Sequence, residues 1–201
     1  DWTDVGVVPS VPVGGHDVSG LIAGGQLGFN VQSGNWVYGI EAQFSWADVD
    51  GSHTFGPSAV QYSTKIDWMG TVAGRLGYAW DRVLLYAKGG VAFVHDEHTV
   101  GTTTSRINFG QLSIDVGTPF LSADETRWGW MVGAGLEVAL GGNWSMKGEY
   151  NYMDFGEERI NFSYIPPLPA GTYPYDIDQQ IHVVKFGINY RFGGGPVVAR
   201  Y

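Results

Sequence analysis

Eight charged residues recur on the polar side of alternating segments, where carboxylates and cationic groups could bind a ligand, transfer a proton or pair with one another. They are four acids and four bases, namely Glu41, Asp67, Glu137 and Glu149 against Arg75, Lys88, Lys147 and Lys185. Because buried charges persist only when they are paired and hydrogen-bonded, this balance predicts an internal salt-bridge network. A selective pore lining is the second interpretation, and catalysis by the carboxylates is the third.

The histidines are the other set of candidate residues, and they are His16, His53, His95, His98 and His182. Asp96 and Glu97 separate His95 from His98, and a His-Asp-Glu-His run could bind a divalent cation, or heme through one imidazole. Solvated histidines in surface loops are the simpler interpretation. The chain has no cysteine, no Gly-x-Ser-x-Gly elbow and no phosphate-binding loop. We therefore expect no enzyme and no cofactor, with heme or a divalent cation as the alternative.

The composition argues against several classes of protein. The 201 residues carry a formal net charge of −9 and only 15% of them are charged, so the basic surface that nucleic-acid binding requires is missing. The 44% of hydrophobic residues argues against disorder. No apolar run approaches the roughly 18 residues of a transmembrane helix. The composition does not exclude a membrane β-barrel, because the apolar and polar faces of its strands average out.

A period of two runs through most of the chain and predicts β-strands. In residues 35–47, Trp36, Ile40 and Phe44 share one face, and Glu41 and Gln43 share the other. Seven segments of this kind are expected, at 18–32, 35–47, 65–79, 83–95, 127–140, 144–153 and 183–192. Most are long enough for the roughly 9–11 residues with which a tilted strand crosses a bilayer. The apolar face is expected to meet lipid, as at Trp36, Ile40, Leu136, Val138, Phe186 and Ile188.

The connections between these segments alternate strictly between short and long. The short ones are 33–34, 80–81 and 141–142, and the long ones are 48–64, 96–126 and 154–179. Short turns on one side and long loops on the other are typical of outer-membrane barrels, whose short turns face the periplasm. The charged and glycine-rich face then fits the narrow lumen of an eight-stranded barrel, toward its periplasmic half.

Two stretches carry a resemblance to a known family. The segments RLGYAWDRVLLYAKGGVAF (75–93) and RWGWMVGAGLEVALGGNWSMKGEYNYMDF (127–155) resemble the small outer-membrane β-barrel proteins of rhizobial-type alphaproteobacteria, a porin family related in architecture to the OmpA-type transmembrane domain. The last strand resembles the barrel-assembly signal at Lys185, Gly187, Tyr190 and Phe192. The resemblance implies a structural surface protein that the barrel-assembly machinery recognises; some members are porin-like and some bind hemin.

Together these features predict an all-β protein, an antiparallel eight-stranded transmembrane β-barrel in the outer membrane of a Gram-negative bacterium. Residues 1–17 are expected to form an external loop or a partial first strand, 18–192 the barrel, and 193–201 a periplasmic C-terminal tail. The predicted role is structural, supporting the envelope and presenting surface loops, with little or no pore activity. A heme or metal receptor and a small porin-like channel are the alternatives. The expected partners are outer-membrane lipid, lipopolysaccharide and the barrel-assembly machinery, and not nucleic acid.

The number of strands sets a further expectation. Bacterial single-chain barrels have an even number of strands, whereas seven strong segments are found, so one more strand must precede residue 18. Only 2–8 is available within the chain, and it is too short to cross a bilayer. We therefore expect the first strand to be partly or wholly missing from this chain. The segments 18–32 and 183–192 should then not be hydrogen-bonded to each other.

Overall fold

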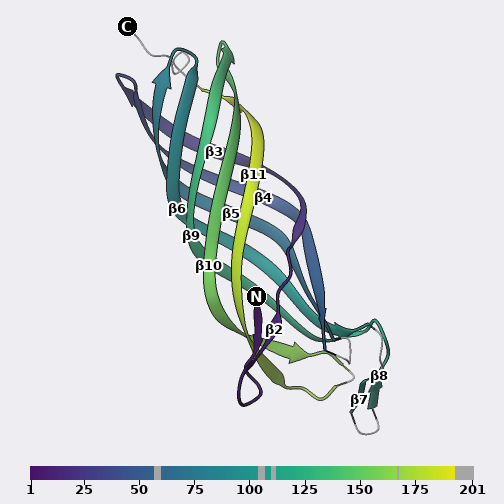
Figure 1. The fold of residues 1–201 in the computed structure, drawn as a ribbon. Coiled ribbons are helices and arrows are strands. Elements are labelled where there is room, and N and C mark those ends of the chain that lie inside the picture. The colour runs from purple at the N-terminus through teal and green to yellow at the C-terminus, as the bar shows by residue number, and fades with distance from the viewer. Residues whose placement is uncertain (57–59, 104–106, 110–111, 167, 193–201) are drawn as a thin grey trace.

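The fold is all-β and antiparallel (Figure 1). The computed structural model describes residues 1–56, 60–103, 107–109, 112–166 and 168–192; the expected tail at 193–201 lies outside them. Seven long strands are β3 (Ser19–Ser33), β4 (Trp36–Phe55), β5 (Val60–Trp80), β6 (Val83–Thr102), β9 (Pro119–Gly141), β10 (Trp144–Tyr164) and β11 (Thr172–Tyr190). Within the described part of the chain, no helix is long and apolar enough to cross a membrane.

Each long strand pairs with the next long strand along the chain, in the order β11-β10-β9-β6-β5-β4-β3. Tight turns close one end of the sheet, where Gly34 and Gly142 adopt positive φ angles of 60° and 56° that glycine tolerates without steric cost. The opposite end carries the chain's N-terminus and the small hairpin of β7 (Ile107–Phe109) and β8 (Leu112–Ile114) (Figure 1). The seven predicted strands and their three short turns are thus confirmed.

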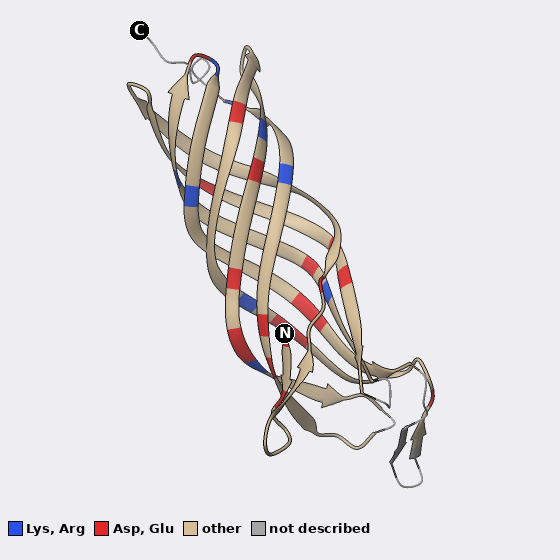
Figure 2. Cartoon of the chain, viewed as in Figure 1, with Lys and Arg blue, Asp and Glu red and all other residues tan. Residues whose placement is uncertain are grey.

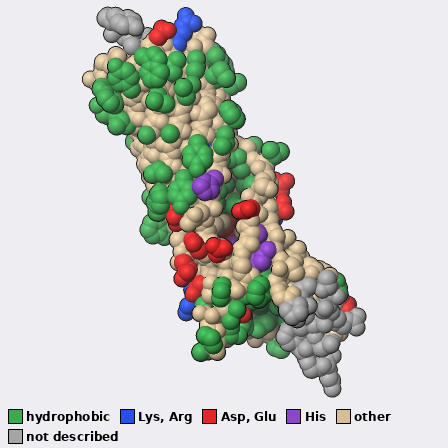
Figure 3. Space-filling model, in the orientation of Figure 1, with side chains coloured by type: hydrophobic (Ala, Val, Ile, Leu, Met, Phe, Trp, Pro, Cys, Tyr) green, Lys and Arg blue, Asp and Glu red, His purple; other side chains and the backbone are tan. Residues whose placement is uncertain are grey.

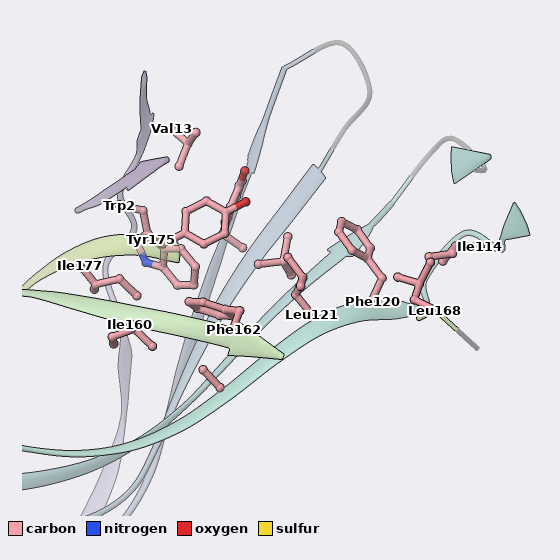
Figure 4. Packing of buried hydrophobic residues seen from close by; sticks show 13 residues of the cluster. Trp2, Val13, Ile114, Phe120, Leu121, Ile160, Phe162, Leu168, Tyr175 and Ile177 are labelled. Atoms are coloured by element: carbon pink, nitrogen blue, oxygen red, sulfur yellow. The ribbon is translucent and has the colours of Figure 1, made fainter. Parts of the chain in front are cut away.

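The strands continue far beyond their predicted outer ends. The segments 48–64, 96–126 and 154–179 were expected to be loops, yet most of their described residues lie in strands. In these extensions most of the large apolar residues point inward. Trp2, Phe162 and Tyr175 pack there in a buried cluster (Figure 4). The sequence analysis predicted strands from an apolar face that meets lipid. The extensions have no such face, because this part of the barrel has the pattern of a water-exposed sheet, with its apolar face inward.

An apolar belt surrounds the half of the molecule near the tight turns (Figure 3). The predicted lipid-facing residues lie on this outer surface, with Phe186 85% and Ile188 70% exposed and Val138 half-buried. Aromatic pairs stand at both borders of the belt, including Trp144 with Tyr190 near the turns and Trp130 with Tyr152 at the other border. Aromatic girdles of this kind mark the two interfaces of a membrane barrel.

Leu136→Arg tests the orientation of the belt. Leu136 points outward in the part of β9 that crosses the belt, between Trp130 and Leu140, and an arginine at the bilayer midplane costs about 2–4 kcal/mol on the lipid face. We expect a loss of folding free energy of that size, measured by denaturant unfolding in vesicles. Leu140→Arg is the matched control on the same strand, because it lies at the border of the belt, where the cost falls to about 0–1 kcal/mol. Equal losses at both positions would contradict the assignment.

The sheet has an open seam between β3 and β11. Of the described residues, β3 pairs only with β4, and β11 pairs with β10 and, over three residues, with β1 (Trp2–Asp4). The two edges are therefore not hydrogen-bonded to each other through their backbones, as expected. Both strands run from the outer end toward the tight turns. One strand that runs in the opposite direction would thus be antiparallel to both edges.

The N-terminal segment covers the outer part of this seam. Trp2 pairs with Ile177, and the amide of Asp178 donates to the carbonyl of Asp1 at 3.0 Å. The chain then turns back through β2 (Val11–Gly14), which pairs with β1. Residues 2–4 therefore occupy a strand position, but only beside the outer portion of β11.

Candidate functional site: the lumen charge network

Charged residues of the long strands gather in two zones, separated by a stretch without charges (Figure 2). The zone nearer the tight turns contains most of the predicted lumen network, and its side chains lie inside the barrel. Its side chains come from β4, β5, β6, β9, β10 and β11. Strand alternation directs them inward, because every second residue of a strand points to the same face.

Glu149 is the centre of this network and its side chain is fully buried. Its carboxylate accepts hydrogen bonds from Lys88 Nζ at 2.6 Å, Lys147 Nζ at 3.0 Å and Asn151 Nδ2 at 2.8 Å. Lys88 also donates to Glu41 at 2.9 Å. Each buried cation thus meets a carboxylate, which offsets the cost of removing these charges from water.

A second pair joins the network at the side of the tight turns. The guanidinium of Arg75 donates to Glu137 Oε2 at 2.6 Å and lies over the ring of Tyr86, 3.6 Å from its centroid. The hydroxyl of Tyr86 donates to Glu149 at 2.9 Å and so connects the two parts. Gly135 makes room for this ring, because a Cβ there would stand 2.4 Å from it.

Two predicted members lie elsewhere. Lys185 borders the network and donates to Gln43 Oε1 at 3.0 Å, while Gln43 donates to Glu41 at 2.7 Å. Asp67 is not in the lumen: it pairs with the exposed Lys65 at 2.9 Å. A β-bulge between Ile66 and Trp68 shifts the alternation by one residue and turns Asp67 outward. The sequence pattern shows no sign of this bulge.

Apolar layers fill the lumen on both sides of the network. Toward the tight turns it is covered by Val37, Ala79, Leu84 and Tyr86. Toward the outer end, buried residues from six strands form a thicker layer that includes Met69, Met131, Met153 and Val183. The uncharged stretch in Figure 2 corresponds to this layer. The charged side chains are therefore enclosed between two apolar plugs.

A second buried polar group lies beyond the apolar belt, and the sequence analysis did not find it. Arg127, with a side chain 1% exposed, donates to the carbonyls of Gly156 at 2.8 Å and Ile177 at 3.0 Å and to Glu158 at 3.2 Å. Asp96 is fully buried close by, and burial raises its pKa to about 6 despite the opposing effect of Arg127. Arg127 could have been found from the sequence, because it is an even number of residues from Met131 and so shares its inward face of β9. Asp96 could not, because it was expected to lie in a loop.

The five histidines are separated in the structure. His16, His53 and His98 lie inside the outer end, whereas His95 stacks on Trp68 and His182 bonds to the Tyr150 hydroxyl, both on the outer surface. Within the described residues, no three His, Cys, Asp or Glu side chains are grouped to hold a metal ion. The histidines are thus not gathered into one ligand set.

Two grooves of about 830 and 1210 Å³ open along the seam. The larger is lined by residues 22–30 and 32 of β3 and by residues 184–192, which are the end of β11 and the two residues after it. The smaller continues it toward the outer end beside His16 and His98. A strand that paired with both edges would occupy this space. The grooves are therefore accounted for by the unpaired edges.

Residues of the expected assembly signal lie at the end of the last strand. Lys185 and Gly187 point inward from β11, while Tyr190 packs against Trp144 and Phe192 at the border of the belt. Phe192 is 86% exposed. Recognition of these residues by the assembly machinery stays a prediction.

Comparison with known proteins gives one family and several relatives. Residues 5–192 match the family described as outer membrane protein beta-barrel domain. The 31 kDa outer-membrane immunogenic protein of Brucella melitensis is 34% identical over 177 residues, which are 86% of this chain and 67% of that protein. The 22 kDa outer membrane protein of Rhizobium leguminosarum is 28% identical over 84% of this chain and 66% of its own length. The 25 kDa outer-membrane immunogenic protein of Brucella abortus is 28% identical over 85% and 65%.

Proposed function

We propose, from the premise that this chain belongs to the outer-membrane β-barrel family and lies in the bacterial outer membrane, that it is a structural barrel with a closed lumen. Its task is to hold a rigid outer end at the cell surface, without catalysis and without passing solutes. The partners that this role implies are outer-membrane lipid, lipopolysaccharide and the assembly machinery.

The filled lumen is the observation that supports this proposal. Lys88 and Glu149 are fully buried, and Met131 and Met153 are at most 1% exposed in the layer above them. An eight-stranded barrel leaves an interior that side chains just fill. A water path would have to displace both the ion pairs and the apolar layer.

The rigid outer end is the second support. Strands β5, β6 and β10 continue past the belt, and aromatic side chains pack between them (Figure 4). This core would hold the external connections in a defined arrangement. The relatives from Brucella are named as immunogenic outer-membrane proteins, and exposure at the surface agrees with such a role here.

Conductance across planar lipid bilayers tests the closed lumen. Folded protein is identified by its different migration in gel electrophoresis before and after heating. It is expected to give no steady conductance steps. A variant with Lys88→Ser, Glu149→Ser, Met131→Gly and Met153→Gly should give them, because it removes the central ion pair and the methionines of the apolar layer above it. Regular steps from the unaltered chain would contradict the proposal and favour a small channel.

A further inference from the structure

The N-terminal segment, residues 1–17, is attached to the outer end of the barrel through Trp2. This indole is 3% exposed and packs against Tyr62, Phe162 and Tyr175 (Figure 4). His98 meets it edge-on at a centroid distance of 5.4 Å. We call residues 1–17 the latch segment.

A pair of histidines connects the latch segment to β4. His53 Nε2 lies 2.9 Å from the carbonyl oxygen of Val13, and a carbonyl only accepts, so Nε2 carries the proton. A neutral His53 then offers only a lone pair at Nδ1. Its Nδ1 lies 2.9 Å from His16 Nδ1, so His16 donates this bond. The bond needs one of the two facing Nδ1 atoms to lack a proton, so it is lost when both rings carry two protons.

His98 is held in an environment that opposes a positive charge. Its Nδ1 lies 3.1 Å from Thr64 Oγ1, and among the described residues its Nε2 has no hydrogen-bond partner. The nearest carboxylate oxygen, in Asp96, is 4.0 Å away. Arg127 adds a fixed positive charge on the neighbouring strand. An imidazolium here would be buried and poorly compensated.

We propose that these three histidines form an acid-sensitive latch: while neutral they hold the latch segment on the outer end, and acidification releases it and uncovers the aromatic cluster around Trp2. The device rests on the hydrogen-bonded His16–His53 pair and on the buried contact between His98 and Trp2. It is independent of whether the lumen conducts.

Charged and titratable groups face the histidines from every neighbouring element. They are the Asp1 amino group, Asp4 and Asp17 on the latch segment, Tyr62 on β5, Asp96 on β6, Arg127 on β9, and Tyr175 and Asp178 on β11. Glu158 on β10 contacts Arg127. Asp17 raises the pKa of His16, but burial and His53 outweigh this effect.

The direction of the pH effect follows from the folded pKa values. Burial lowers the pKa of His16 to about 4 and that of His98 to about 3, below the ordinary 6.5, so their contribution to latching is present above that value and is lost as the pH falls. Asp96, with its pKa raised to about 6, opposes them because it gains a proton in the latched state. The two histidines together exceed this single group, so we expect the released fraction to rise by roughly tenfold or more between pH 7.5 and pH 5.

The chain has no cysteine, so a single introduced thiol reports on release. Val13→Cys places it at a site that is 3% exposed, and Val8→Cys places it at a site that is 99% exposed on the same segment. The ratio of maleimide labelling at the two sites, in vesicles, corrects for the pH dependence of the reagent. We expect this ratio to rise by roughly tenfold or more from pH 7.5 to pH 5.

Histidine variants assign the effect. His16→Asn with His98→Gln should abolish the rise of the labelling ratio from pH 7.5 to pH 5, because only the opposing effect of Asp96 remains. His95→Gln, on the outer surface, is the matched control and should leave the dependence unchanged. A ratio that does not change with pH in the parent, or that rises equally in the double variant, overturns the proposal.

Discussion

A strand joined ahead of Asp1 is expected to increase the folded fraction and the folding stability of this chain in vesicles. The reason is the seam, where β3 and residues 179–190 of β11 each present an unpaired backbone edge. Unsatisfied backbone groups in hydrocarbon cost several kcal/mol each. A strand antiparallel to both edges would form hydrogen bonds with the unpaired backbone groups of β3 and β11 and would fill the two grooves.

The register of β1 defines the design of that strand. Since Trp2 pairs with Ile177, residues added before Asp1 would pair with β11 from Gln179 onward. Apolar residues belong opposite Val184, Phe186 and Ile188 on the outer surface, and small polar residues on the inner one. Folding is measured in vesicles by protease protection and by the difference in migration before and after heating.

The control is the same strand with its alternation shifted by one residue. This shift turns every apolar side chain into the lumen, so the shifted strand should not rescue folding. Equal rescue by both designs, or no rescue by the matched one, would mean that the seam does not accept a strand.

Glu149→Gln is expected to be the most damaging single substitution in the lumen. Removing one partner of a buried ion pair costs about 3–5 kcal/mol, because the opposite charges stay buried without compensation. Lys88 and Lys147 both donate to Glu149 and would retain only Glu41 as a neighbouring carboxylate. The measurement is the free energy of unfolding in vesicles, followed through tryptophan fluorescence.

Asp67→Asn is the matched control for this substitution. It removes a carboxylate that also pairs with a lysine, but both side chains are exposed, and such pairs contribute about 0–1 kcal/mol. Losses of similar size at the two positions would show that burial of the network does not govern its energetics.

The alternation of the sequence was sufficient to predict most of the barrel. The spacing of Trp36, Ile40 and Glu41 distinguished an apolar from a polar face, and the short turns set the order of the strands. These features are local, because successive residues of a strand alternate between its two faces, whatever the strand pairs with. For the same reason the lumen network was found almost complete, since its members repeat at inward positions.

Only the tertiary structure decided which charged side chains meet and where a bulge interrupts the alternation of inward and outward residues. The bulge beside Asp67, the pairing of Lys88 with Glu149 and the burial of Arg127 and His98 in the outer end depend on how strands from distant parts of the chain are aligned. That alignment is non-local, since the register between strands and the stagger of the barrel determine which inward side chains share a layer. The sequence by itself thus determined the two faces of each strand, while the three-dimensional register assembled the ion network, the two plugs and the histidine latch.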